Sequence, residues 1–137
     1  MTTKGNAIGL LSIKIAKNGE PSQTMSTPFI TLDLKSNNLS IGGYNIEPEG
    51  LEGAQIDIHE QHIQPGTYFF TEDFRVAGFY TPRMQNSWNG DVGGEITLIE
   101  VDLTKKFVRG TAKFKAVSKY DDSYAEVDFN FSLTGAQ

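Results

Sequence analysis

The two histidines of the chain lie three residues apart, in the segment His59-Glu60-Gln61-His62. Imidazole and carboxylate groups are common ligands of divalent metal ions. Two histidine rings point the same way at a spacing of four residues on a helix or of two on a strand. At a spacing of three on an extended chain, the two rings lie on opposite faces. The pattern therefore favours a polar strand end followed by a turn. A weak metal site at His59, Glu60 and His62 is the alternative.

A second set of potential ligands is Asn89, Asp91 and Glu95, which glycines and one valine separate. Carboxylate and amide oxygens on a flexible loop suit calcium. An EF-hand loop needs a longer series of ligands than these three. The segment is therefore predicted to be a glycine-rich turn that enters a strand at Glu95, and calcium binding is the weaker alternative.

Other catalytic signatures are missing from the sequence. It has no cysteine, no G-x-S-x-G turn for a serine nucleophile, and no phosphate-binding glycine loop with its lysine and helix. Carboxylates for glycoside hydrolysis exist at Glu72, Asp73 and Asp91, but surface acidity explains them more simply. A formal charge of −5 argues against nucleic acid as a partner. We therefore expect no catalytic residue and no cofactor. A hydrolase with an unrecognised site ranks below the two binding hypotheses given at the end of this section.

The hydrophobic pattern predicts strands. Apolar residues occupy alternate positions from Ala125 to Leu133 and from Val108 to Ala116, with polar residues between them. The segment 95–101 has the same period, with a shift that indicates a bulge near Leu98. Residues 95–134 are therefore predicted to form a three-stranded antiparallel meander.

Shorter alternating runs fill the first half of the chain, and no window keeps a period of 3.6 with a credible cap. About eight or nine short strands with little or no helix predict an all-β fold, an antiparallel β-sandwich or β-barrel. The whole chain, residues 1–137, is expected to be one such domain. Three segments are predicted to be irregular because they are rich in glycine, proline or small polar residues, namely 18–28, 42–53 and 81–94.

Several short motifs resemble a known family. They are Leu39-Ser40-Ile41-Gly42-Gly43, Ile56-Asp57-Ile58 followed by Pro65-Gly66-Thr67-Tyr68, Gly93-Gly94-Glu95-Ile96-Thr97-Leu98, and Val108 to Phe114 after Asp102. Over residues 30–134 the chain resembles the DUF6252-like group, small β-rich domains of unknown function common in Bacteroidetes lipoproteins. The resemblance implies a β-rich fold. That group has no assigned catalytic residues and its members usually look exported, whereas this chain shows neither a leader nor a lipid-anchor cysteine.

The aromatic residues suggest where a partner binds. Most phenylalanines, from Phe69 to Phe131, are predicted to be core by alternation, whereas Tyr44, Tyr120 and Tyr124 fall at predicted turns as rim contacts or caps. The loop 81–94 is long for a compact domain. Because aromatic residues are frequent at binding hot spots, we predict a binding surface at this loop. It comprises Tyr80, Arg83, Met84 and Trp88; the alternative is that Trp88 folds back over the core.

The leading hypothesis is therefore a non-enzymatic β-scaffold that binds a protein or a small molecule through its loop end. The alternative is a closed barrel that holds an apolar ligand, with room left by the small core residues Gly110, Ala112, Ala116 and Ala125. Edge strands also make a homo-oligomer conceivable.

The start of the chain bears on its compartment. The run 7–15 alternates like a strand and contains Lys14, unlike the apolar stretch of a signal peptide. No run is long enough for a transmembrane helix, and without a cysteine there is no thiol for a lipid anchor. A cytoplasmic location is expected, although an exported protein whose leader has been removed fits the same sequence.

Overall fold

A computed structural model describes residues 6–47 and 50–135, and all regular structure in these ranges is β-strand. The predicted all-β antiparallel fold is thereby confirmed. The strands are β1 (Ala7–Lys17), β2 (Gln23–Met25), β3 (Phe29–Lys35), β4 (Asn38–Glu47), β5 (Gly50–Ile58), β6 (Gly66–Phe69), β7 (Val76–Thr81), β8 (Trp88–Gly90), β9 (Glu95–Asp102), β10 (Phe107–Val117) and β11 (Tyr124–Gly135). No segment of the described chain forms an apolar helix that could span a membrane.

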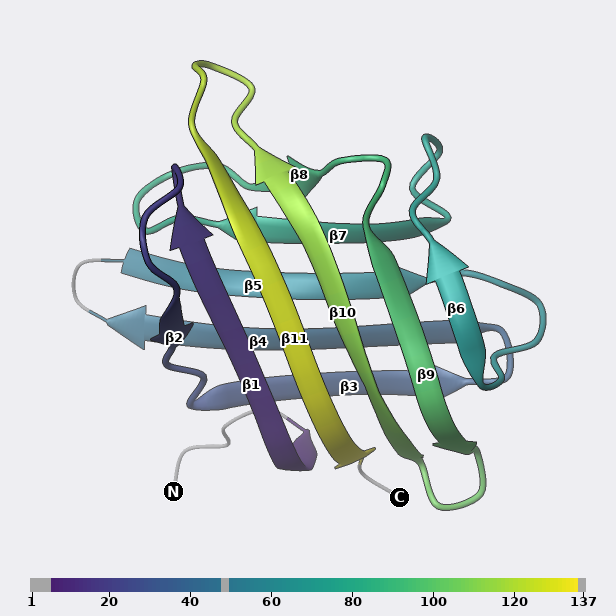
Figure 1. Ribbon diagram of the computed structural model, residues 1–137. Helices are drawn as coiled ribbons and strands as arrows, with labels where there is room; N and C mark the ends of the chain where they lie inside the picture. Colours follow the sequence, from purple (N-terminus) through teal and green to yellow (C-terminus); the bar gives the residue numbers. More distant parts are fainter. Residues whose placement is uncertain (1–5, 48–49, 136–137) are drawn as a thin grey trace.

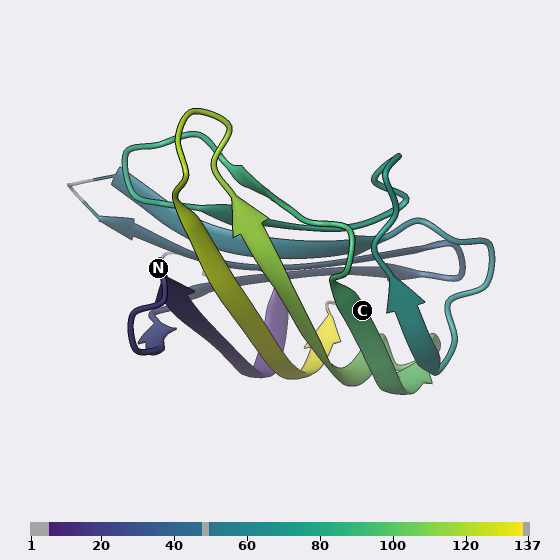
Figure 2. The same cartoon turned by 45° about the horizontal axis from the view of Figure 1, so that its top comes forward.

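The strands form one antiparallel sheet that curls into two layers, like half of a barrel. In the first layer the strand order is β2-β1-β11-β10-β9-β6, and in the second it is β8-β7-β5-β4-β3. The long strands of the first layer cross steeply over those of the second (Figure 1). Seen from the second angle, the first layer bends strongly at one end (Figure 2), so that its inner face wraps the core.

The C-terminal meander has the predicted form. β9 pairs with β10, and β10 pairs with β11 in an unbroken register from Phe107 opposite Thr134 to Val117 opposite Tyr124. Arg109 lies opposite Glu100 and the next residue lies opposite Leu98, which leaves Ile99 as the extra residue of a bulge. The predicted bulge near Leu98 is therefore confirmed, and it turns Ile99 toward solvent.

Of the three segments predicted to be irregular, 42–53 is mostly strand, whereas 18–28 and 81–94 lie mostly outside strands, as predicted. Segment 18–28 contains β2, segment 42–53 belongs mostly to β4 and β5, and segment 81–94 contains β8. Gly42 and Gly53 misled the prediction, because the ring of Tyr44 lies where their missing Cβ atoms would be. Tyr44 is accordingly a strand residue, not a turn residue as predicted.

β8 is the three-residue strand that joins the two layers. Tyr80 of β7 lies opposite Trp88, and Ala116 of β10 lies opposite Gly90. A loop as long as 81–94 was predicted because the segment is rich in polar residues and glycines. Within this segment β8 pairs with a strand on each side and Trp88 is buried in the core, whereas residues 82–87 connect β7 to β8.

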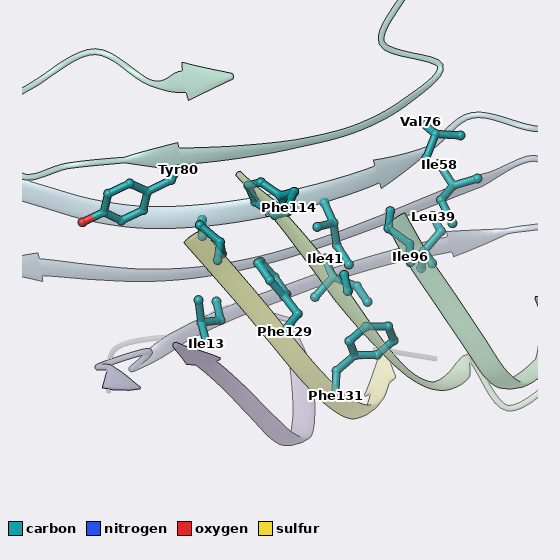
Figure 3. Packing of buried hydrophobic residues seen from close by; sticks show 14 of the residues in the cluster. Ile13, Leu39, Ile41, Ile58, Val76, Tyr80, Ile96, Phe114, Phe129 and Phe131 are labelled. Carbon is teal, nitrogen blue, oxygen red and sulfur yellow. The ribbon is translucent and has the colours of Figure 1, made fainter. Parts of the chain in front are cut away.

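Apolar side chains from both layers fill the interior (Figure 3). The rings of Phe70 and Phe114 lie 5.3 Å apart, and Phe129 follows at 6.2 Å from Phe114. Gly78, Gly90 and Gly94 make room for them, since a Cβ atom at any of the three would come within 2.8 Å of the Phe70 or Phe114 side chain.

The small core positions named for the closed-barrel alternative lie within the packed interior. A Cβ atom at Gly110 would lie 3.0 Å from the ring of Phe131 and 2.2 Å from the carbonyl oxygen of Thr97. Ala112, Ala116 and Ala125 belong to the same packed cluster. Not every phenylalanine is core as predicted, because Phe69 and Phe74 are exposed.

The outer edge of β3 is covered by side chains instead of a strand. The amide of Asn6 donates to the carbonyl oxygen of Leu32 at 3.1 Å, and its oxygen accepts from the Leu32 N–H at 2.9 Å. The ammonium group of Lys106 donates to the carbonyl oxygen of Leu34 at 3.3 Å. These contacts occupy backbone groups through which an edge strand could pair with another chain.

Candidate functional site

Two of the four residues predicted to form the binding surface lie in the core. Tyr80 points inward from β7 and is fully buried, and Trp88 is 6% exposed. Their rings meet edge to face, with centroids 5.7 Å apart. The alternative in which Trp88 folds back over the core therefore describes its position, and Tyr80 cannot present a surface to a partner.

The hydroxyl group of Tyr80 is held by charged groups at the end of the core. It donates to Oε2 of Glu52 at 2.6 Å, and the guanidinium group of Arg83 lies 3.7 Å from Oε1 of the same carboxylate. Burial raises the pKa of Tyr80, and the hydrogen bond to Glu52 raises it further. Arg83 also donates to the carbonyl oxygen of Gly50 at 2.8 Å, which fixes the loop after β7 to the start of β5.

Met84 is the predicted residue that does reach solvent. It lies in the turn between β7 and β8 with a φ of 67°, and 80% of its surface is exposed. Its sulfur lies beside Gly50, where a Cβ atom would be only 2.9 Å away. The turn thus holds an apolar side chain outside the core.

Met84 borders a groove of about 490 Å³. Tyr120, in the turn between β10 and β11, also lines it and is 79% exposed. Trp88, which is 6% exposed, and Leu51, at the start of β5, also line it. The remaining lining residues are Gly50, Thr81, Gln85 and Asn86. Three chain segments, 50–51, 81–88 and the turn at Tyr120, therefore contribute an apolar centre with a polar margin.

Hydrogen bonds order the margin of this loop-end groove. The hydroxyl groups of Thr81 and Ser87 are 2.6 Å apart, and the amide of Asn86 donates to the hydroxyl oxygen of Tyr120 at 3.4 Å. The sequence indicated Tyr120 only as a rim contact or cap, and Leu51 was missed. No local signal joins them to Met84, because sheet pairing alone brings these segments together.

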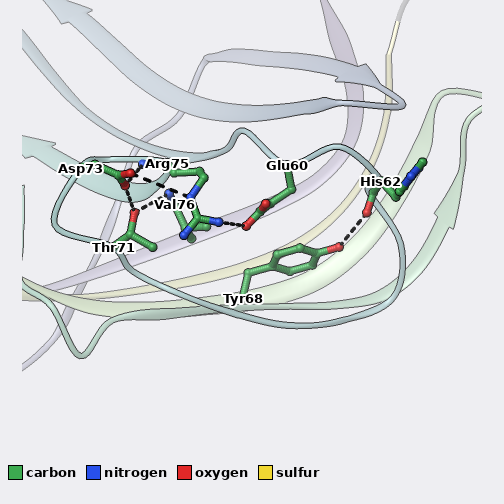
Figure 4. Close-up of polar contacts among 7 residues, drawn as sticks. All are labelled: Glu60, His62, Tyr68, Thr71, Asp73, Arg75 and Val76. Atoms are coloured by element: carbon green, nitrogen blue, oxygen red, sulfur yellow. Dashed lines mark hydrogen bonds and ion pairs between the residues drawn. The ribbon is translucent and has the colours of Figure 1, made fainter.

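The histidine segment lies at the other end of β5, around a hollow of about 660 Å³. Glu60 pairs with Arg75 at 2.6 Å, and the ring of His62 points away from Glu60 (Figure 4). The hydroxyl group of Tyr68 donates to the carbonyl oxygen of Gln64 at 2.9 Å, which pins the turn. Nδ1 of His59 is 2.6 Å from the side-chain oxygen of Asn38.

The contacts of segment 59–62 are those of a polar strand end followed by a turn, which the spacing of the two histidines favoured. In segment 89–95, Asn89 belongs to β8, and Glu95 lies 4.0 Å from the ammonium group of Lys113. The N–H of Asp91 donates to the carbonyl oxygen of Lys115 at 2.8 Å. Among residues 6–47 and 50–135, no three histidine, aspartate or glutamate side chains are placed to hold a metal ion.

No family model, curated protein or solved structure matches the chain. The resemblance to the DUF6252-like group therefore stays a prediction, and the geometry of the molecule carries the functional argument.

Proposed function

We propose that this protein is a non-enzymatic binding domain whose loop-end groove, between Met84 and Tyr120, receives an apolar side chain of a partner protein. The observation that carries the proposal is that two large side chains, each about four-fifths exposed, flank a groove that Trp88 lines from the core. Methionine and aromatic residues are enriched at protein interfaces, whereas charged residues are depleted at their centres.

The frame around the groove supports this proposal. Tyr80, Glu52 and Arg83 tie the loop to β5, and Trp88 is packed against Tyr80, so the floor is preorganised. A rigid floor reduces the entropy lost on binding. The side chain of Met84 remains adaptable, because its unbranched thioether can follow the shape of an inserted group.

Selection from a displayed library of random peptides tests the proposal. Peptides enriched on the parent protein are measured against Met84→Asp, which places a charge at the apolar centre. We expect Met84→Asp to weaken binding about tenfold or more. The matched control is Val92→Asp, at an exposed apolar residue outside the residues that line the groove.

The control should leave the affinity unchanged. If selection enriches no peptide, or if enriched peptides bind Met84→Asp as tightly as the parent, the loop-end groove is not the binding site. Trp88 is unsuitable for this test, because its replacement would damage the core as well as the groove.

A further inference from the structure

Five neighbouring strands of the first layer present one row of short polar side chains to solvent. Thr67 lies opposite Thr97, Thr97 opposite Thr111, Thr111 opposite Asn130, and Asn130 opposite Ser12. The row therefore runs across β6, β9, β10, β11 and β1, which lie side by side in Figure 1. With strands about 4.8 Å apart, it extends about 19 Å.

A second row runs alongside, and its charges alternate. Glu95, Lys113, Asp128 and Lys14 lie opposite one another on β9, β10, β11 and β1. Lys113 lies 4.0 Å from Glu95 across the strands. Two acidic and two basic groups cancel, so this row favours neither an anion nor a cation along its length.

The two rows border a hollow of about 510 Å³. Its floor is lined by Ser12, Thr97, Thr111 and Asn130, and the longer side chains of the charged row form one wall. Short side chains between longer ones thus form a groove across the strands. This outer-face groove lies on the first layer, away from Met84 and Tyr120.

Much of the polar capacity of the floor is not used within the protein. The hydroxyl groups of Thr67 and Thr97 are 3.1 Å apart. Within residues 6–47 and 50–135, the side chains of Ser12, Thr111 and Asn130 make no hydrogen bond to another protein group. Hydroxyl and amide groups both donate and accept, so these side chains can bind a ligand that does the same.

We propose that the outer-face groove binds a linear, uncharged oligosaccharide. A sugar chain offers hydroxyl groups that donate and accept, and in its extended form the repeat of its units is close to the spacing of the strands. One polar side chain per strand can therefore meet each successive sugar unit. The balanced charges of the wall match a neutral ligand. A polar ligand fits a floor on which the hydroxyl and amide groups are exposed, while the two apolar lining residues, Ala112 and Phe129, are buried.

An aromatic ring stands at one end of the charged row. Phe69 of β6 lies opposite Glu95, and 65% of its surface is exposed. The face of an aromatic ring carries partial negative charge, which attracts the polarised C–H groups of a sugar ring. A sugar ring stacked on Phe69 would explain why this side chain is exposed, although the alternation of apolar residues predicted it to be buried.

Titration with cellohexaose, xylohexaose, mannohexaose and chitohexaose tests the proposal, with the disaccharide of each for comparison. The readout is the amide chemical shifts of isotope-labelled protein. We expect at least one hexasaccharide to shift the amides of Ser12, Thr111 and Asn130, and its disaccharide to bind at least about tenfold more weakly, because fewer hydrogen bonds form.

Thr111→Val removes one floor hydroxyl and keeps a β-branched side chain that suits a strand. It should raise the Kd about fivefold, the effect of losing one hydrogen bond. The matched control is Thr134→Val, on β11 but outside the residues that line the groove, which should leave the Kd unchanged. If Thr111→Val does not fold, Ser12→Ala provides the same test.

Three results would overturn the proposal. The first is that no hexasaccharide shifts the amides of the groove. The second is that the Thr111→Val and Thr134→Val variants bind alike. The third is that dilution of the protein alone shifts the same amides, which would mean that a second copy of the chain covers this face. None of these results bears on the loop-end groove, because the two sites share no lining residue.

Discussion

Tyr80 brings a hydroxyl group to the end of an apolar core, where Glu52 accepts its hydrogen bond. The sequence placed Tyr80 beside a long loop and suggested a contact residue, because tyrosine is common in both settings. Its inward direction follows from its place in β7, where most residues are buried. Met84 was predicted correctly as a surface residue, since nothing about its segment required burial.

The buried hydroxyl group of Tyr80 predicts that the free energy of unfolding depends on pH in the alkaline range. The pKa of Tyr80 is raised in the folded state, so above its ordinary value of about 10 the unfolded chain loses this proton first. The unfolded state then binds fewer protons, and the free energy of unfolding falls as the pH rises. We expect urea unfolding between pH 9 and about 11 to show this loss in the parent and less of it in Tyr80→Phe.

The control for this experiment is Tyr120→Phe, because Tyr120 is mostly exposed. It should keep the pH dependence of the parent. At neutral pH, Tyr80→Phe should lower the free energy of unfolding by about 1–2 kcal/mol, because Glu52 loses a hydrogen-bond donor. An unchanged pH profile in Tyr80→Phe would mean that other groups set the alkaline transition.

At the scale of elements, the sequence predicted best the strands whose two faces differ in polarity. β10 and β11 alternate without interruption, so their pairing and the bulge opposite β10 could be inferred. β8 could not, because three residues are too few to show a period and its glycine suggests a turn. Its place depends on Phe70 and Phe114, which occupy the space above Gly90.

Gly90→Ala tests this account of β8. The added Cβ atom would lie 2.6 Å from the ring of Phe70 and 2.8 Å from the carbonyl oxygen of Gly78, so the joint between the layers must move. We expect the free energy of unfolding in urea to fall by about 1–3 kcal/mol.

Gly135→Ala is the comparison, because the nearest atom to its added Cβ would be 3.4 Å away, in ordinary contact. It should change stability by about 0.5 kcal/mol or less. Equal stability of the two variants would show that the ring packing at β8 is looser than described.

For the molecule as a whole, the curled sheet leaves β3 as an edge, and Asn6 with Lys106 covers it. The all-β class followed from strand-length alternation, but the half-barrel did not, because closure depends on contacts between segments far apart in the chain. The loop-end groove has the same origin. Sequence patterns report local period, whereas both the curl and the groove arise from tertiary pairing.

Asn6→Ala should free the N–H and carbonyl groups of Leu32 at this edge. An exposed edge can pair with another chain. We expect the variant to self-associate at lower protein concentration than the parent, measured by sedimentation velocity. Asn38→Ala, which changes the asparagine at the first residue of β4, should behave like the parent. Identical sedimentation of Asn6→Ala and the parent would show that Asn6 does not protect the edge.

The pairing of β1 with β11 affects how the protein folds during its synthesis. Asn18 and Tyr124, which bond where these strands meet, are separated by 106 residues. During translation, β1 therefore cannot pair with β11 until nearly the whole domain has been synthesised. Ile13 and Ile15, buried in the finished fold, stay uncovered by β11 during that time. The domain can therefore complete its fold only late in synthesis. Until then, the apolar face and the unpaired edge of β1 are exposed and can aggregate with other nascent chains.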